Sequence, residues 1–363
     1  MTIVFVSYHY SADIHSPAQW LQRLQYYVGW LECLAQQHTI IRVDQINYEG
    51  HFKHNGVQYF CVTNDKAKNY FPSKLHALVK QLQPDVVVVG GFHFPLQVLL
   101  LRQALGKKAA IIIQHHAEKP FKGLKKYMQQ FASCKANVFL FAAAETGLQW
   151  VQKGNLHNAK KVRQLMEVSS TFYPVEKQIA KEKTAVAGTP VYLWVGRLNE
   201  NKDPLTAVKA FLKFATLHPQ ARLYMVYQTD ELLFDIQKLL ANHPANNAVL
   251  LLGQVQHDDL LYWFNSADYY LSASFYEGSG TALCEAMSCG CIPIVTNIPS
   301  FKTICGGCGL LYQPGSEEQL LAALLKSTTL TQEKEKTKCI QQFKAALSFD
   351  AIAKKMNDII YEP

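Results

Sequence analysis

Residues 191–204 read Val-Tyr-Leu-Trp-Val-Gly-Arg-Leu-Asn-Glu-Asn-Lys-Asp-Pro, and this stretch decides how the fold is interpreted. The five apolar residues predict a buried strand, and Gly196 predicts a turn after it. Asp203 followed by Pro204 predicts the N-cap and the first residue of a helix. A strand, a glycine turn and a helix in this order are typical of a parallel α/β sheet.

The same alternation of short β-branched runs and helical patterns continues along the chain. In the first half, the predicted strands are residues 2–6, 40–44, 57–62, 85–89, 109–114 and 138–142, with helices at 17–36 and 72–81. In the second half, the predicted strands are residues 191–195, 222–227, 248–252, 269–273 and 292–296, with helices at 204–217, 258–265 and 282–289. This pattern predicts two doubly wound α/β domains.

The length of 363 residues agrees with two domains at roughly 150 residues each, and two domains imply a cleft. We expect a Rossmann-like domain at residues 1–172 and a second one at 191–345. Residues 173–190 are polar, rich in lysine and end in Gly-Thr-Pro, which predicts a linker. A last helix within 346–363 is expected to pack on either domain, including back on the first.

The composition indicates a globular protein, because 49% of the residues are apolar and 18% are charged. Lys and Arg outnumber Asp and Glu by 36 to 28, which favours anionic partners. The excess is concentrated between Arg102 and Lys135, where Glu118 is the only acid. No aromatic-interleaved stripe or nucleic-acid reader motif accompanies these lysines, so we expect no nucleic-acid partner.

Residues 121–131 mix lysines with apolar side chains at helical spacing, namely Phe121, Leu124, Met128 and Phe131. Such a face could rest on an anionic membrane or meet a lipid-linked acceptor. A helix packed on its own sheet with solvated lysines explains the pattern equally well.

The amino terminus and the cysteines indicate a cytoplasmic protein. Met1 to Ser7 is a short apolar run without a preceding basic region, so it predicts a first strand and no signal peptide. Nine cysteines, an odd number, make a disulfide framework improbable. Cys-x-Cys and Cys-x-x-Cys at 289–291 and 305–308 suggest zinc in isolation, but small buried apolar side chains explain both pairs. We expect neither a metal nor a cofactor.

Two groups of polar residues in the second half point to a phosphorylated, hydroxyl-rich ligand. Arg197 and Lys202 flank a predicted helix N-terminus, where backbone amides and the helix dipole favour a diphosphate. The alternative is a solvated basic turn. The segment Glu277-Gly-Ser-Gly-Thr-Ala-Leu-Cys-Glu285 follows another strand, and its two carboxylates are suited to accepting hydrogen bonds from vicinal hydroxyls. The alternative is that both acids are ordinary charges near a helix N-terminus.

The second half resembles the retaining glycosyltransferases of family 4, which have the GT-B architecture of two facing Rossmann-like domains with a cleft between them. The matching stretches are Gly-Arg-x4-Lys at 196–202, the turn and helix from Gly253 to Leu261, Asn-Ser-Ala-Asp at 265–268, and Glu-x7-Glu at 277–285. They cover roughly residues 191 to 320 in the family's order.

The resemblance implies a role for each matching residue. Arg197 and Lys202, next to Gly196, would hold the donor diphosphate, and Glu277 would contact the transferred sugar. Glu285 would bind the ribose hydroxyls. The turn near Val255 would meet the base, and the donor would contact the backbone of the small residues Gly278, Ser279, Gly280 and Thr281.

The N-terminal half resembles the family more loosely. After the strand at 109–114 comes His115-His116, where related enzymes place a histidine near the reacting sugar, and the sequence does not choose between the two. The glycine pair that many relatives carry after the first strand is absent, because that region reads Ser-Tyr-His-Tyr-Ser at 7–11.

The predicted function is a retaining, metal-independent transfer of a sugar from a nucleotide-diphosphate sugar to a saccharide or glycolipid acceptor. A sugar-nucleotide epimerase, a glycoside phosphorylase of the same architecture and a non-catalytic subunit are the alternatives. The sequence leaves the base, the sugar and the acceptor open.

Overall fold

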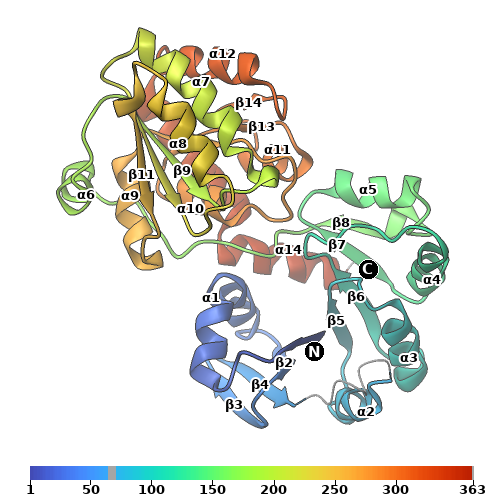
Figure 1. Ribbon diagram of the computed structural model, residues 1–363. Helices are drawn as coiled ribbons and strands as arrows, with labels where there is room; N and C mark the ends of the chain where they lie inside the picture. The colour runs from blue at the N-terminus through green and yellow to red at the C-terminus, as the bar shows by residue number, and fades with distance from the viewer. Residues whose placement is uncertain (64–70, 362–363) are drawn as a thin grey trace. The chain divides into compact units, whose positions relative to one another are not determined.

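The computed structural model describes residues 1–63 and 71–361 and divides the chain into two compact units (Figure 1). The first unit is Met1–Ser169 together with the C-terminal segment from Ser348 onward, and the second is Ser170–Leu347. Each unit has its own sheet and its own apolar core. The predicted α/β class with parallel sheets is confirmed.

The sheet of the first unit has the strand order β3-β4-β2-β1-β5-β6-β7-β8. Neighbouring strands are parallel, except that β3 and β4 pair in antiparallel orientation. The strands are β1 (Thr2–Ser11), β2 (Thr39–Ile46), β3 (Gly50–His54), β4 (Val57–Val62), β5 (Val86–Gly90), β6 (Ala110–Gln114), β7 (Val138–Phe141) and β8 (Val162–Gln164). The helices are α1 (Pro17–Leu34), α2 (Ser73–Gln81), α3 (Pro95–Leu105), α4 (Leu124–Ser133), α5 (Ala144–Gln152) and α14 (Phe349–Tyr361).

The sheet of the second unit is parallel throughout and has the order β11-β10-β9-β12-β13-β14. Its strands are β9 (Val191–Gly196), β10 (Arg222–Tyr227), β11 (Val249–Gly253), β12 (Tyr269–Ser272), β13 (Ile292–Thr296) and β14 (Leu310–Tyr312). Its helices are α6 (Lys177–Thr184), α7 (Pro204–Leu217), α8 (Leu233–Ala241), α9 (Leu260–Ser266), α10 (Thr281–Ser288), α11 (Pro299–Cys305), α12 (Glu317–Ser327) and α13 (Gln332–Gln342), followed by a π-helical turn at Phe343–Leu347.

The central strands are apolar without alternation because helices cover both faces of each sheet. Val86 to Val89 are four consecutive buried valines, and the three isoleucines 111–113 of β6 are also buried. In the second core, the rings of Tyr192 and Tyr269 stack with centroids 5.0 Å apart. Their hydroxyl groups both bond to Ser327, so these buried polar atoms have partners.

Most predicted elements are present, and β10, β13 and α7 have the predicted bounds. β1 is longer than predicted and continues to Ser11, with a register shift between Val6 and Tyr10. The short strands β3, β8 and β14 lie at or beside the ends of the sheets and were not predicted, because three to five residues carry little periodic signal.

The expected linker at 173–190 requires a correction, because these residues belong to the second unit and contain α6. The Thr184 hydroxyl bonds to the Ser266 hydroxyl at the end of α9 (2.8 Å), and Lys177 forms an ion pair with the buried carboxylate of Asp268. A single buried residue, Ala180, gives α6 almost no apolar stripe, which is why the segment reads as a polar connector. The second unit accordingly extends over 170–347 in place of 191–345.

The C-terminal helix α14 packs on α1 in the first unit, and a glycine makes this close approach feasible. A Cβ atom on Gly29 of α1 would lie 2.5 to 2.7 Å from three ring atoms of Phe349, well inside van der Waals contact. The position therefore admits no side chain unless the Phe349 ring moves.

We predict that Gly29→Ala lowers the stability of the first unit by about 1–3 kcal/mol through overpacking, less the fraction of a kcal/mol that alanine gains in a helix. In a Phe349→Leu background the ring is absent, so the same substitution should become neutral or stabilising. Thermal unfolding midpoints of the four proteins measure this coupling. An equal effect of Gly29→Ala in both backgrounds would contradict the packing described here.

Candidate functional site

The strand order of the second unit identifies the edge at which a ligand site is expected. Numbered from β9, the order is 3-2-1-4-5-6, so the connections leave in opposite directions from the neighbouring strands β9 and β12. Open α/β sheets bind ligands at the carboxyl ends of the strands at this switch point. The residues after Gly196 and those after Ser272 leave the sheet at this point.

The segment after β9 is held in place by two side-chain caps. The Asn199 side chain accepts a hydrogen bond from the Lys202 amide (3.1 Å), and the Asp203 carboxylate accepts one from the Thr206 amide (3.3 Å). Asp203 has a left-handed backbone (φ 44°) and Pro204 begins α7, so the predicted N-cap and N1 positions are confirmed. Arg197 is exposed at the start of this segment.

The segment after β12 leads through Glu277 and Gly278 into α10. Its N-cap, Gly280, has φ 58°, and a Cβ there would lie 3.0 Å from both Ile304 and Phe301, so both conformation and space favour glycine. The amides of Leu283 and Cys284 donate to the Gly280 carbonyl. The amides of Thr281 and Ala282 come before these bonds in the first turn of α10, where backbone N–H groups lack intrahelical acceptors.

Three contacts join the two segments. The Lys202 ammonium forms an ion pair with the Glu277 carboxylate, and both side chains are partly buried. Next to this pair, the Asn201 side chain donates to the Tyr276 carbonyl (2.9 Å), and the Phe275 amide donates to the Asn201 carbonyl (2.8 Å). Two residues that the sequence placed 75 positions apart are therefore in direct contact.

Glu285, the second acid of the motif, is buried and bonds to His257, whose Nε2 lies 2.7 Å from Glu285 Oε1. The imidazole of His257 also stacks on the ring of Phe172, with centroids 4.9 Å apart. Burial raises the pKa of the Glu285 carboxyl, and the hydrogen bond and charge of His257 offset only part of this effect. A buried carboxylate with a single imidazole partner is typical of a functional position.

The pKa of His257 is also raised. Burial lowers it, but the hydrogen bond to Glu285 and the charges of Glu285 and Asp258 outweigh burial. His257 lies within the segment from Gly253 to Leu261 but was not predicted from the sequence to be a site residue. Its position four residues after that glycine was the available signal. Val255 lies in the same connection between β11 and α9 and is half-buried.

Glu277 and Glu285 both act on Tyr270 of β12. Burial raises the pKa of this hydroxyl, and the charges of the two carboxylates raise it further. The two acids therefore lie in one region of the second unit, beside the carboxyl end of β12.

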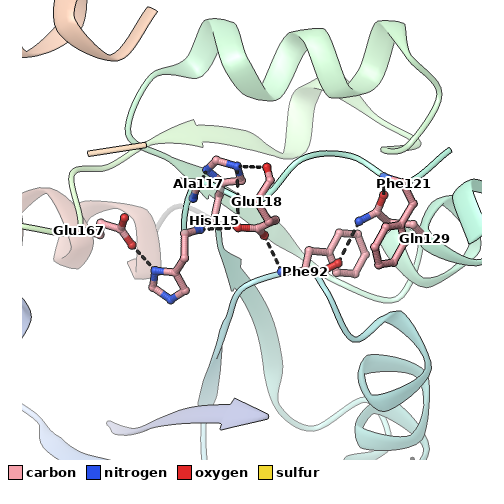
Figure 2. A network of polar contacts seen from close by, with 8 residues as sticks. Phe92, His115, Ala117, Glu118, Phe121, Gln129 and Glu167 are labelled. Carbon is pink, nitrogen blue, oxygen red and sulfur yellow. Dashed lines mark hydrogen bonds and ion pairs between the residues drawn. The ribbon is translucent and has the colours of Figure 1, made fainter. Parts of the chain in front are cut away.

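The two candidate histidines of the first unit differ in their surroundings. His115 is buried: its ring stacks on Phe141 (4.6 Å between centroids) and meets Trp150 edge-on. Its Nε2 donates to the Glu118 carbonyl (3.0 Å), and its Nδ1 accepts from the Ala117 amide (3.4 Å), as Figure 2 shows. His115 is thus a packed histidine with both ring nitrogens occupied.

His116 is the accessible one of the pair, with 43% of its side chain exposed at the carboxyl end of β6. Its Nδ1 contacts the Glu167 carboxylate, and its amide donates to Glu118 Oε2 (2.7 Å). Desolvation lowers the pKa of His116, but the charge and hydrogen bond of Glu167 and the charge of Glu118 raise it above its usual value. An imidazole held by a carboxylate is suited to proton transfer or to stabilising charge.

The remaining sequence candidates concern metals and membranes. Cys289, Cys291, Cys305 and Cys308 are buried and unbridged. Across residues 1–63 and 71–361, no group of three or more His, Cys, Asp or Glu side chains is arranged to hold a metal ion. In the same part of the chain, no helix is both long enough and apolar enough to cross a membrane.

Comparisons with known proteins agree with this geometry. The family described as Glycosyl transferases group 1 matches residues 175–345, which include both segments at the switch point. The O-antigen chain mannosyltransferase B of Escherichia coli is 37% identical over 159 residues, covering 42% of this chain and 41% of the relative. The GDP-mannose:cellobiosyl-diphosphopolyprenol alpha-mannosyltransferase of Xanthomonas campestris is 26% identical over 220 residues, covering 60% of this chain and 57% of the relative.

The chain thus spans between two fifths and three fifths of the length of these curated relatives. Among solved structures, Anabaena HepE in complex with UDP matches 100% of both chains with a TM-score of 0.72 at 13% identity, a likeness of fold. The motifs, the two Rossmann-like units and the family match lead to one conclusion: residues 175–345 match the group 1 glycosyltransferases, and the chain has the GT-B fold.

Proposed function

We propose that this protein transfers a sugar from a nucleotide-diphosphate sugar to a saccharide or lipid-linked acceptor, with retention of the anomeric configuration. The observation that carries the proposal is the contact of Lys202 with Glu277 at the switch point of the second unit. A cation and a carboxylate at one point match the junction between a diphosphate and a sugar. The cation binds phosphate oxygens, and the carboxylate accepts hydrogen bonds from sugar hydroxyls.

In this proposal, the chemistry depends on stabilising the departing diphosphate. Arg197 and Lys202 supply two positive charges, and the amides at the start of α10 supply oriented dipoles. Negative charge grows on the leaving group as the bond to the sugar breaks, and fixed positive charge lowers such a barrier most effectively. These groups belong to the protein, so the reaction would need neither a metal nor a cofactor.

The rest of the donor would be bound by the same unit. Glu285, held by His257, would accept hydrogen bonds from the ribose hydroxyls, and the backbone near Val255 would meet the base.

His116 of the first unit would lie near the reacting sugar, because it is the accessible histidine of the pair.

GDP-mannose is the first donor to test, because both curated relatives described above are mannosyltransferases by name. The name of the Xanthomonas relative includes a polyprenyl diphosphate acceptor, which supports a lipid-linked saccharide as the first acceptor. We place the protein in the cytoplasm, where nucleotide sugars are made.

A thermal-shift series with GDP-, UDP-, ADP- and dTDP-sugars tests donor binding, because a ligand raises the unfolding temperature according to its affinity and concentration. One nucleotide class should raise it clearly more than the others. A donor that is recovered with an altered sugar in the absence of acceptor would indicate an epimerase. No shift with any of them would argue against the proposal.

We predict that Lys202→Ala and Arg197→Ala each lower turnover of the bound donor by roughly 10²-fold or more, because each removes positive charge from the leaving group. Release of the nucleoside diphosphate at saturating donor is the measurement. Lys209→Ala is the matched control, since Lys209 is an exposed lysine of α7 beyond the segment after β9. Unchanged turnover in folded Lys202→Ala and Arg197→Ala proteins would refute the assignment.

We also predict that Glu285→Gln lowers the pKa of His257, because it removes the carboxylate whose hydrogen bond and charge raise this pKa against the effect of burial. Titration by histidine NMR, assigned with His257→Gln, measures the shift. Asp258→Asn is the control and should change the pKa less, because the Asp258 side chain is fully exposed.

The raised pKa of His257 also predicts the direction in which protein stability changes with pH. A raised folded-state pKa means that the wild-type contribution of His257 is complete below about pH 6.5 and is lost as pH rises through the folded pKa. The stability advantage of wild type over Glu285→Gln should therefore be larger at pH 6 than at pH 8.5. An advantage that grows with pH would contradict the pairing.

A further inference from the structure

Helix α4 (Leu124–Ser133) lies on the first unit with a polar inner face. Gln129, Ala132 and Ser133 are its buried residues. The Gln129 side chain accepts from the Phe121 amide (3.1 Å) and donates to the Phe92 carbonyl (2.9 Å), as Figure 2 shows. It also accepts from the Asn155 side chain (2.8 Å). The helix is therefore held by hydrogen bonds.

Ser133, one turn later on the same face, continues this pattern. Its hydroxyl donates to the Gln130 carbonyl (2.6 Å) and accepts from the His157 amide (3.0 Å). Both polar residues of the inner face, Gln129 and Ser133, thus have their hydrogen-bond partners inside the protein. They fix which side of α4 faces the unit.

The outer face of α4 is apolar. Leu124, Tyr127, Met128 and Phe131 are 87%, 63%, 46% and 59% exposed. Their spacing of 0, 3, 4 and 7 residues places them on one stripe of the helix. An ordinary surface helix buries such a stripe against its own core, so α4 has the reverse arrangement, and a contiguous exposed apolar patch marks an interaction surface.

The charges around this stripe are positive. Lys122 and Lys125 are exposed beside it, Lys126 lies over the Tyr127 ring at 6.0 Å, and Lys135 lies over the Phe131 ring at 5.7 Å. Glu118 is the only acid between residues 102 and 135, and it is buried, where it accepts from the amides of residues 92 and 116. Between residues 102 and 135, the stripe and its neighbours along the chain therefore present apolar and cationic groups without an exposed acid.

We propose that α4 is an interfacial helix that docks the first unit on an anionic lipid bilayer. Apolar side chains flanked by lysines match the boundary between acyl chains and anionic headgroups. The apolar side chains enter this boundary, and the lysines contact the phosphates of the headgroups. A protein partner would place acids at fixed positions, whereas these lysines are long, exposed and spread around the stripe, which suits a continuous anionic surface. The proposal is independent of the donor site, because lipid binding needs neither donor nor acceptor.

The test is co-sedimentation of the full-length protein with large vesicles, either of phosphatidylcholine alone or with about one third phosphatidylglycerol. Wild type should bind the anionic vesicles, bind the neutral ones much less, and lose binding as salt is raised. The variant Leu124→Ser with Phe131→Ser should reduce the partition coefficient by about tenfold or more. Lys122→Gln with Lys125→Gln should reduce binding and its dependence on salt.

The matched control is Leu217→Ser with Phe234→Ser, which removes two exposed apolar side chains from the second unit and should leave binding unchanged. Unfolding temperatures check that each variant folds, which is expected because the replaced side chains are exposed. The proposal is overturned if wild type does not bind anionic vesicles at low salt, or if the Leu124 and Phe131 variant binds as wild type does. It is also overturned if the stripe instead mediates a dimer seen in sedimentation velocity without vesicle binding.

Discussion

The ion pair between Lys202 and Glu277 is the interaction on which the architecture of the candidate site depends. It joins the segment after β9 to the segment after β12, the two places where the chain leaves the sheet in opposite directions. Both charges are partly buried, and each would be costly there without the other. The pair therefore holds a cation and a carboxylate together before any ligand arrives, so little reorganisation is needed when a diphosphate approaches Lys202.

A second pair, with a more deeply buried carboxylate, extends the site along the same edge. Glu285 lies inside α10, and His257 reaches it from the connection after β11 while stacking on Phe172. The imidazole supplies one hydrogen bond to the carboxylate and fixes the position of one oxygen. Together the two pairs bring polar groups to one edge of the sheet, since the connections after three strands of one parallel sheet, β9, β11 and β12, contribute them.

Much of this could be predicted from the sequence, because apolar strands, glycine turns and helix caps are local signals. Arg197, Lys202, Glu277 and Glu285 were found by their positions after predicted strands. The partnership of His257 with Glu285 was not, because it joins residues 28 positions apart through tertiary packing. The spacing of Leu124 and Phe131 predicted a stripe, but only the buried hydrogen bonds of Gln129 decide that this stripe faces outward. Likewise, the difference between His115 and His116 depends on which neighbour each ring meets.

The central claim is that the second unit binds a nucleoside diphosphate at the carboxyl ends of β9 and β12. The most direct measurement is a crystal structure of the whole protein with the nucleoside diphosphate that binds most tightly. The account predicts the diphosphate within hydrogen-bond distance of Lys202, Arg197 and the first amides of α10, with the ribose hydroxyls on Glu285. A nucleotide bound elsewhere, with its diphosphate away from Lys202 and its ribose away from Glu285, would contradict it.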